Sequence, residues 1–412
     1  MPWARWERWK TGIRWALRQR PFGLPPAGGS FDRASLLAVT ALVGIGTLLV
    51  FSATALGTGD GSEDGLTWGP LVRHLVSIGV GVLAFLGALT LKPRTLRWLS
   101  KYLVWFSLVL LWLVLVPGLG RKEFGSTRWL DLGGFRFQPS EVAKLGMGLF
   151  LSNYLAGFRS VLQDWKKGLV PMAVALALVI APLFLEPDMG SIFLLGILAT
   201  LMVAVAGTRL RYLAMLFGTA VVGLLVLFVQ DPVRFARLVG WLFPNLSYQG
   251  AGHQNHFAMR FITAGGPTGS GLGAGPGHSL GYLTQSSSDF IFSVAGEELG
   301  FVGIVGIVVL FAVIAVQGMR LVHRCREDFQ RFAAFALTLL LVLPAWIHMM
   351  VNMGMVPTKG IACPFLSFGG TSMVISLAAA GLLQRLHLEA TAAESAVDHW
   401  RLATNPHAEG AR

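Results

Sequence analysis

Charged side chains that could take part in chemistry are few in this sequence, and they lie in separate short stretches. The candidates are Arg128, Glu141, Lys144, Asp188, Asp289, Glu297 and Lys359. A carboxylate can act as a general base, and Lys or Arg can stabilise negative charge on a bound or departing group. Whether these residues meet depends on the elements that carry them.

The composition is that of a membrane protein. Of 412 residues, 54% are hydrophobic and only 13% are charged, whereas a soluble domain has about 25% charged residues. A soluble globule and a disordered chain are therefore both excluded. The two cysteines, Cys325 and Cys363, are expected on opposite sides of the membrane, so no disulfide framework is predicted.

Ten apolar stretches have about the length that a membrane-spanning helix needs. They are residues 34–56, 71–91, 99–116, 140–155, 169–185, 191–206, 213–229, 290–316, 332–351 and 364–383. The predicted fold class is an all-α polytopic membrane protein of about ten transmembrane helices. A large extracytoplasmic loop, 231–288, is expected between the seventh and eighth helices.

The distribution of basic residues predicts the orientation. With the N-terminus in the cytoplasm, the inner segments hold 23 of the 33 Lys and Arg residues and the outer segments hold nine, as the positive-inside rule requires. The net charge of +12 is thus mainly a topology signal, and nucleic-acid binding is not expected. The predicted organisation is a cytoplasmic basic segment (1–33), a ten-helix domain (34–388) and a cytoplasmic tail (389–412). Segment 1–33 fits either an amphipathic helix on the inner membrane surface or a disordered tail.

This topology brings the candidate residues to one side of the membrane. Arg128 and Lys359 fall in outer loops, Asp188 in an outer turn, and Asp289 at the outer start of the eighth span. Glu141 and Lys144 lie three residues apart near the outer end of the fourth span and thus share a helix face. Charges at this depth are costly unless they are paired or line a wet cavity. One polar cavity open to the outer surface is therefore predicted.

Several of these residues also have simpler interpretations. Asp289 follows three serines and could cap the helix that begins at Phe290. Glu141 and Lys144 could form a purely structural ion pair, and Arg128 could contact lipid headgroups. Glu297 and Glu298 are adjacent in the eighth span, so at most one of them can face the cavity.

The expected outer loops also contain a run of glycines and three histidines. Glycines recur on alternate positions from 269 to 277, which fits either backbone contact with a phosphate or a flexible loop. Three outer histidines, His253, His256 and His278, do not have a recognised zinc-ligand spacing. No metal site is predicted from these residues.

Four motifs, in order along the chain, resemble one family. Residues 125–130 (GSTRWL) and 137–145 (FQPSEVAKL) resemble the RW…QPSE-x-AK signature of the SEDS family (shape, elongation, division, sporulation). Residues 187–190 (PDMG) resemble its PDxG turn, and 289–300 (DFIFSVAGEELG) resemble its DFIFAVIGEELG. Residues 357–360 (PTKG) and 364–370 (PFLSFGG) resemble its PTKG…LPxISYGG. The Thr-Lys-Gly form is closer to the division branch, FtsW, than to the elongation branch, RodA.

The resemblance implies a peptidoglycan glycosyltransferase that polymerises lipid II at the outer face of the cytoplasmic membrane. Its implied partners are a class B penicillin-binding protein, which cross-links the glycan, other division proteins and membrane lipids. The catalytic Asp of the family corresponds to Asp289, its cavity pair to Glu141 and Lys144, and its outer-loop cations to Arg128 and Lys359. Gln138, Ser140, Asp188 and Glu297 lie in the matching motifs and are expected to contact substrate.

The sequence departs from the family near the site. The family usually has Leu-Pro-Glu-x-His-Thr before the Asp, but here Leu283 is followed by 284–288, TQSSS. A Gln-Ser of the family is Phe257-Ala258, and a family Asn in the ninth span is His348. Asp289 itself is retained.

The implied reaction is consistent with these residue types. The leaving group is a lipid pyrophosphate of low basicity, so the second carboxylate of glycosidases is not required. Asp289 would accept the proton of the attacking sugar hydroxyl. Lys144, Arg128, Lys359 or a divalent cation (Mg²⁺ or Mn²⁺) would stabilise the pyrophosphate. The alternatives are a lipid II flippase, an elongation-type polymerase and a non-catalytic scaffold.

Overall fold

The computed structural model describes residues 23–56, 68–123, 126–132, 135–158, 162–216, 218, 223, 232–243, 253–275, 287–357 and 360–404. Among these residues, six helical stretches are long and apolar enough to cross a membrane. They are Arg33–Thr54, Gly69–Thr90, Pro93–Val114, Trp165–Leu185, Ile291–Arg324 and Asp328–Asn352. Met189–Val205 is a shorter apolar helix.

The helices coincide with nine of the ten expected stretches. In order they are α2 (Arg33–Phe51), continued by the π-helix η1 (Ser52–Leu56), α3 (Gly69–Thr90), α4 (Pro93–Val114), α5 (Pro139–Phe158), the π-helix η3 (Trp165–Leu169) with α6 (Val170–Leu185), α7 (Met189–Val205), α12 (Ile291–Arg324), α13 (Asp328–Asn352) and α14 (Gly370–Thr404). The seventh expected stretch, 213–229, lies mostly outside the described residues. The last helix begins six residues later than expected and runs well beyond residue 383, into the predicted tail.

Capping residues and prolines mark the start of several of these helices. Asp32 caps α2 by accepting hydrogen bonds from the N–H groups of Ala34 and Ser35, and Asp188 caps α7 through the N–H of Ser191. Pro70 and Pro93 stand in the first turns of α3 and α4, where the missing proline N–H costs no helical hydrogen bond.

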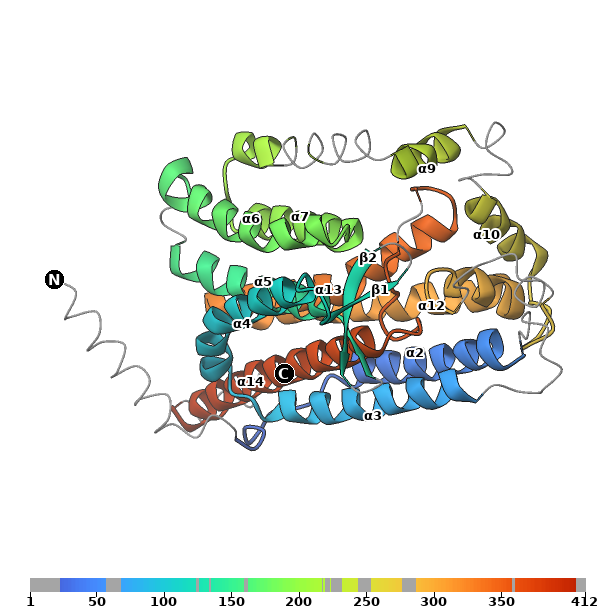
Figure 1. Ribbon diagram of the computed structural model, residues 1–412. Coiled ribbons are helices and arrows are strands. Elements are labelled where there is room, and N and C mark those ends of the chain that lie inside the picture. The colour runs from blue at the N-terminus through green and yellow to red at the C-terminus, as the bar shows by residue number, and fades with distance from the viewer. Residues whose placement is uncertain are drawn as a thin grey trace.

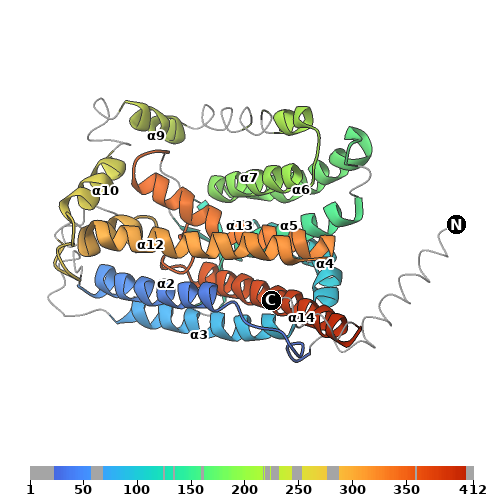
Figure 2. The ribbon, with the colours of Figure 1, turned by 180° about the vertical axis from the view of Figure 1, so that it is seen from behind.

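The helices pack side by side in one bundle (Figures 1 and 2). Helix α5 lies between α4 and α13, α12 packs against α13 and α2, and α14 runs along α3. Large side chains such as Met147, Leu151 and Phe311 are fully buried between them. Helix α5 is buried over most of its length, so its polar side chains are held inside the bundle.

Two segments that were expected on the outer side contain helices and strands that the sequence pattern did not predict. The loop after α4 forms a three-stranded antiparallel sheet of β1 (Gly120–Glu123), β2 (Ser126–Leu132) and β3 (Phe135–Phe137). The expected loop 231–288 contains α9 (Pro232–Leu242) and α10 (His253–Ala264). Trp241 of α9 donates a hydrogen bond to the carbonyl of Gly354, 2.7 Å away.

Helix α12 is broken at Gly300, whose φ of 67° is left-handed. The glycine-containing segment 265–275 fills the break. The N–H groups of Phe301 and Val302 donate to carbonyls of this segment, and two of its N–H groups donate to the carbonyls of Glu297 and Glu298. The segment therefore satisfies the backbone groups that the break leaves free.

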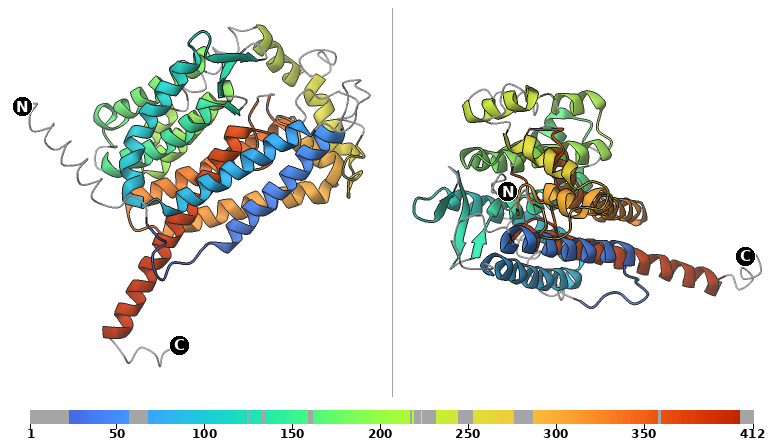
Figure 3. Two further views of the ribbon diagram at one scale, coloured as in Figure 1. Left: turned by 60° about the horizontal axis from the view of Figure 1, so that its bottom comes forward. Right: turned by 90° about the vertical axis from the view of Figure 1, so that its right-hand side faces the viewer.

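The C-terminal half of α14 extends past the other helices (Figure 3). The segment before α2 docks against it. Arg385, 3% exposed, donates to the carbonyls of Gly23, Leu24 and Leu89 and pairs with Glu389. These bonds join the start of the described chain to its last helix.

Candidate functional site

Glu141 and Lys144 form a buried ion pair in the first two turns of α5. The Lys144 Nζ lies 2.7 Å from Oε1 of Glu141, and each residue is 8% exposed. Among the described residues this is the one hydrogen bond of the ammonium group, which has three N–H donors. Two donors therefore remain for a ligand. The predicted pairing on one helix face is present.

Arg128 of β2 reaches the turn between α6 and α7. Its guanidinium donates to the backbone carbonyls of Glu186 and Pro187, and no carboxylate of the described residues forms an ion pair with it. Asp188 of the same turn is 2% exposed and accepts hydrogen bonds from the N–H and hydroxyl of Ser191. Arg128 thus contacts the turn that contains Asp188 through its backbone.

Glu186, which the sequence analysis did not select, is the most deeply buried acid of this turn at 1% exposed. Neither carboxyl oxygen has a hydrogen-bond partner among the described residues. Burial raises the pKa of Glu186 to about 8, Asp188 adds to the rise, and Arg128 opposes it. The Glu186 side chain is therefore mainly protonated near neutral pH.

Asp289 lies in a turn just before α12 and is partly exposed. The N-cap residue of α12 is Phe290, one residue after Asp289. The Asp289 carboxyl lies against Gly360, where an added Cβ would be 3.1 Å from Oδ2 and 3.7 Å from Cγ. Since a side chain would crowd the carboxylate, the glycine permits this close approach.

The segment 360–361 links Asp289 to the start of α7. A Cβ on Gly190 would lie 2.9 Å from the side chain of Ile361 and 3.2 Å from the carbonyl oxygen of Gly360. The same short segment thus contacts the first turn of α7 on one side and Asp289 on the other. Three parts of the chain that are far apart in sequence meet here.

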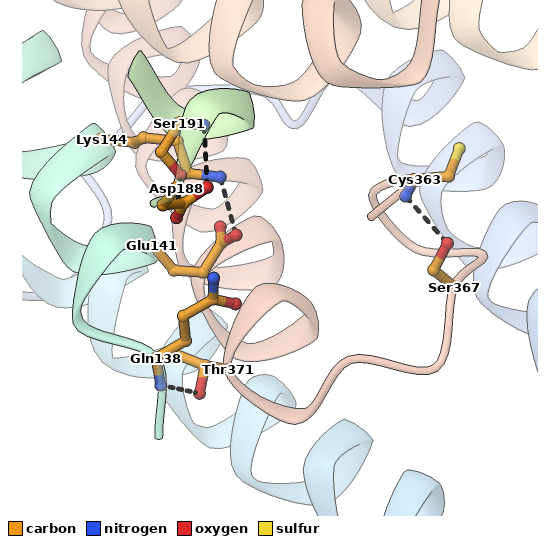
Figure 4. Close-up of polar contacts among 8 residues, drawn as sticks. All are labelled: Gln138, Glu141, Lys144, Asp188, Ser191, Cys363, Ser367 and Thr371. Atoms are coloured by element: carbon orange, nitrogen blue, oxygen red, sulfur yellow. Dashed lines mark hydrogen bonds and ion pairs between the residues drawn. The ribbon is translucent and has the colours of Figure 1, made fainter. Parts of the chain in front are cut away.

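Gln138 and Ser140 flank the start of α5. The Gln138 N–H donates to the hydroxyl of Thr371 at 3.0 Å, which ties α5 to the first turn of α14. The Ser140 hydroxyl is buried and has no hydrogen-bond partner among the described residues. Figure 4 shows the Gln138 side chain directed towards Glu141 and shows Asp188 near the pair.

Two predicted site residues remain, Glu297 and Lys359. The Glu297 carboxyl lies against Gly275, at a Cβ-to-Cδ distance of 2.6 Å if a Cβ were added. Its neighbour Glu298 accepts hydrogen bonds from Ser52 and from the N–H of Gly273. Both carboxylates thus contact the glycine-containing segment 265–275. Lys359 lies outside the described residues.

The described residues contain no group of three or more His, Cys, Asp or Glu side chains that could hold a metal ion. Of the three outer histidines, His278 lies outside the part of the chain that is described. No step of the chemistry is assigned to a metal ion.

Residues 33–392 match the cell cycle protein family of FtsW, RodA and SpoVE. The chain belongs to the FtsW/RodA/SpoVE family. Together with its six apolar helices, this makes it an integral membrane protein. The predicted resemblance to SEDS proteins is confirmed.

Relatives from several bacteria resemble the chain over most of its length. A probable peptidoglycan glycosyltransferase FtsW of Trichlorobacter lovleyi is 34% identical over 365 residues, which cover 89% of this chain and 94% of that protein. Another of Thioalkalivibrio sulfidiphilus is 36% identical over 364 residues, covering 87% and 90%.

Solved structures of the family have a similar fold. A chain from a peptidoglycan synthase complex, studied for the coordination of polymerization and crosslinking, gives a TM-score of 0.71 at 28% identity and covers 88% of this chain and 98% of its own. The rod shape determining protein RodA of Thermus thermophilus gives 0.63 at 28% identity, covering 87% and 97%. The helix arrangement of this FtsW/RodA/SpoVE protein is thus that of its relatives.

Proposed function

We propose that the protein is a peptidoglycan glycosyltransferase that polymerises lipid II into glycan strands during cell division. The observation that carries this function is family membership over residues 33–392. Relatives named FtsW support the division role. The structural neighbours include RodA, but the sequence relatives and the Thr-Lys-Gly motif favour division over elongation.

The proposed topology has ten spans, both termini in the cytoplasm and the large loop 231–288 on the outer side of the cytoplasmic membrane. The positive-inside distribution of Lys and Arg supports it. In this orientation Glu141, Asp188 and Asp289 all lie near the outer surface. The site would then face the compartment in which glycan strands are made.

Asp289 is the proposed general base. A sugar hydroxyl attacks the anomeric carbon of a second lipid-linked chain, the new glycosidic bond forms, and the bond to the lipid pyrophosphate breaks. The hydroxyl proton passes to the Asp289 carboxylate, and the pyrophosphate leaves as an anion. Partial exposure of Asp289 beside Gly360 supports this role, because the carboxylate is reachable and its position is constrained.

Lys144 and Arg128 are the proposed cations for the departing pyrophosphate, together with Lys359. Lys144 keeps two N–H donors beyond its bond to Glu141, and the contacts of Arg128 are to neutral carbonyls. Both can therefore add charge-assisted hydrogen bonds to an anion. Glu141 holds Lys144 in place. Gln138, Ser140 and Asp188 are proposed to contact the sugar or phosphate groups.

A small apolar pocket lies beside Lys144. The Lys144 side chain lines it together with leucines of α7 and residues of α13. These are Leu194, Leu195, Leu198, Leu339, Leu340, Leu343 and Pro344.

The proposed partner is a class B penicillin-binding protein transpeptidase, with further contacts to division proteins and membrane lipids. The similarity to a chain of a synthase complex that couples polymerization to crosslinking supports this partner. Such a pairing would deliver each new strand directly to the crosslinking enzyme.

Reconstitution with purified components tests the function. The protein and its partner are mixed with labelled lipid II in detergent, with crosslinking blocked by a β-lactam, and the glycan products are separated by length. Wild type should form polymer and Asp289→Asn should not. A flippase or a scaffold would form no polymer in micelles, so the absence of product with wild type would overturn the proposal.

A further inference from the structure

The side chain of Asn352, at the end of α13, is completely buried and fully hydrogen-bonded. Its Nδ2 donates to the carbonyl of Asp289 at 3.2 Å and to that of His348 at 2.8 Å. Its Oδ1 accepts from the N–H and the hydroxyl of Ser293, at 3.2 and 2.7 Å. One carboxamide thus joins α13 to the residue before α12 and to the first turn of that helix.

His348 lies one turn earlier on the same face of α13 and is 2% exposed. Its Nδ1 donates to the carbonyl of Ile361 at 2.8 Å, because a carbonyl oxygen can only accept. Ile361 directly follows Gly360, the residue against which the Asp289 carboxyl lies. Consecutive turns of α13 therefore hold the two sides of the Asp289–Gly360 contact.

The backbone before Asp289 is fixed in the same manner by the segment before α14. The carbonyl of Ser287 accepts from the N–H of Phe368 at 2.9 Å, and that of Ser288 accepts from the Ser367 hydroxyl at 2.7 Å. With Asn352, three consecutive carbonyls at 287–289 are bound by other elements. Asp289 precedes the N-cap of α12, so tertiary bonds of this kind must fix its backbone.

We propose that Asn352 and His348 are positioning residues that set the Asp289 carboxylate against Gly360; the catalytic part of this inference rests on the proposed role of Asp289. Both residues act through backbone carbonyls of this region, and the Asn352 amide has no free donor. The family Asn expected at position 348 is replaced by His in this chain. Here a carboxamide occurs one turn later, and it binds the catalytic segment directly.

Kinetic variants test this role in the reconstituted complex. Asn352→Leu removes every hydrogen bond at similar size, and Asn352→Asp keeps the acceptor for Ser293 but loses both donors. A misplacement of about 1 Å can cost about 100-fold in rate. Both variants should lower kcat by about 10- to 100-fold, with KM within about twofold. Thr338→Val is the matched control, because the buried Thr338 hydroxyl bonds only within α13.

A second readout measures the geometry without activity. Asp289→Cys and Gly360→Cys are combined with Cys325→Ala and Cys363→Ala, and disulfide formation under mild oxidation is timed. The Asp289 Cγ is 3.7 Å from the Cβ position of residue 360, so small adjustments give disulfide geometry. Cross-linking should be fast in this background and about tenfold slower with Asn352→Leu or His348→Ala added. Thr338→Val should leave it unchanged.

The two readouts separate failure of this inference from failure of the proposed function. Cross-linking that is equally fast with Asn352→Leu, together with an unchanged kcat per folded molecule, would overturn the positioning role. A lower yield or melting temperature alone, with both readouts unchanged, would overturn it as well, since it would reveal a purely structural residue. Full polymerisation by Asp289→Asn would instead overturn the base role, which the cross-linking result does not affect.

Discussion

The contact between Glu141 and Lys144 depends on a single helix. The position of Asp289 depends on three separate segments. The ion pair spans two turns of α5, where a spacing of three residues brings the side chains together. Asp289 stands outside α12 and is held by α13, by the segment before α14 and by the close approach of Gly360. The proposed site thus combines a locally determined part with one that depends on long-range packing.

This difference predicts where each part is vulnerable. The pair should respond to changes in its own two residues and very little to changes elsewhere. Asp289 should respond to residues that are distant in sequence and carry no charge, such as Gly360.

The largest effect on stability is expected from splitting the ion pair. Lys144→Met leaves the Glu141 carboxylate buried without its partner and should lower the free energy of unfolding by about 3–5 kcal/mol. Polymerisation should be lost as well. Thermal unfolding in detergent measures the loss of stability, and the lipid II assay measures the loss of polymerisation.

The double variant Glu141→Gln/Lys144→Met is the control for that experiment. Removing both charges should restore most of the stability, because no unpaired charge remains buried, whereas activity should stay lost. If the double variant polymerised lipid II normally, the pair would be a structural ion pair only.

A smaller effect, confined to activity, is expected at Gly360. Gly360→Ala places a methyl group 3.1 Å from Oδ2 of Asp289 and should lower kcat about tenfold through a misplaced carboxylate. Gly306→Ala is the matched control, because nothing lies within 4 Å of its added Cβ. Equal activity of the two variants would show that Asp289 does not need this close approach.

A pH dependence of stability is expected from Glu186. Burial holds its pKa at about 8 in the folded protein, above the ordinary value of 4.5. Its contribution to stability is therefore full below about pH 4.5 and is lost as the pH rises through about 8. The melting temperature of wild type, relative to that of Glu186→Gln, should fall between about pH 5 and 9. Parallel curves for the two proteins would contradict a protonated Glu186.

Periodicity and spacing predicted the parts of the molecule that depend on local geometry. Nine of the ten apolar stretches coincide with helices of the described residues, and the pairing of Glu141 with Lys144 follows from their spacing. The break at Gly300 was not predicted, because it depends on a glycine segment that packs against it from another part of the chain.

The remaining site contacts could not be read from the sequence because they join distant segments. Asn352 and Ser367 look like ordinary polar residues until their hydrogen bonds to 288–289 are known. Glu186 carried a usable signal, since it adjoins Pro187 and Asp188 in an apolar region, but its burial depends on the fold. The contact of the Glu297 carboxyl with Gly275 likewise joins distant segments.

The rate of glycan-strand formation by Asp289→Asn in the reconstituted complex tests the central claim most directly. The amide keeps the size and the backbone bonds of Asp289 but cannot accept the hydroxyl proton, so the initial rate should fall by at least about 100-fold while the melting temperature stays near that of wild type. A rate within about twofold of wild type would contradict Asp289 as the general base.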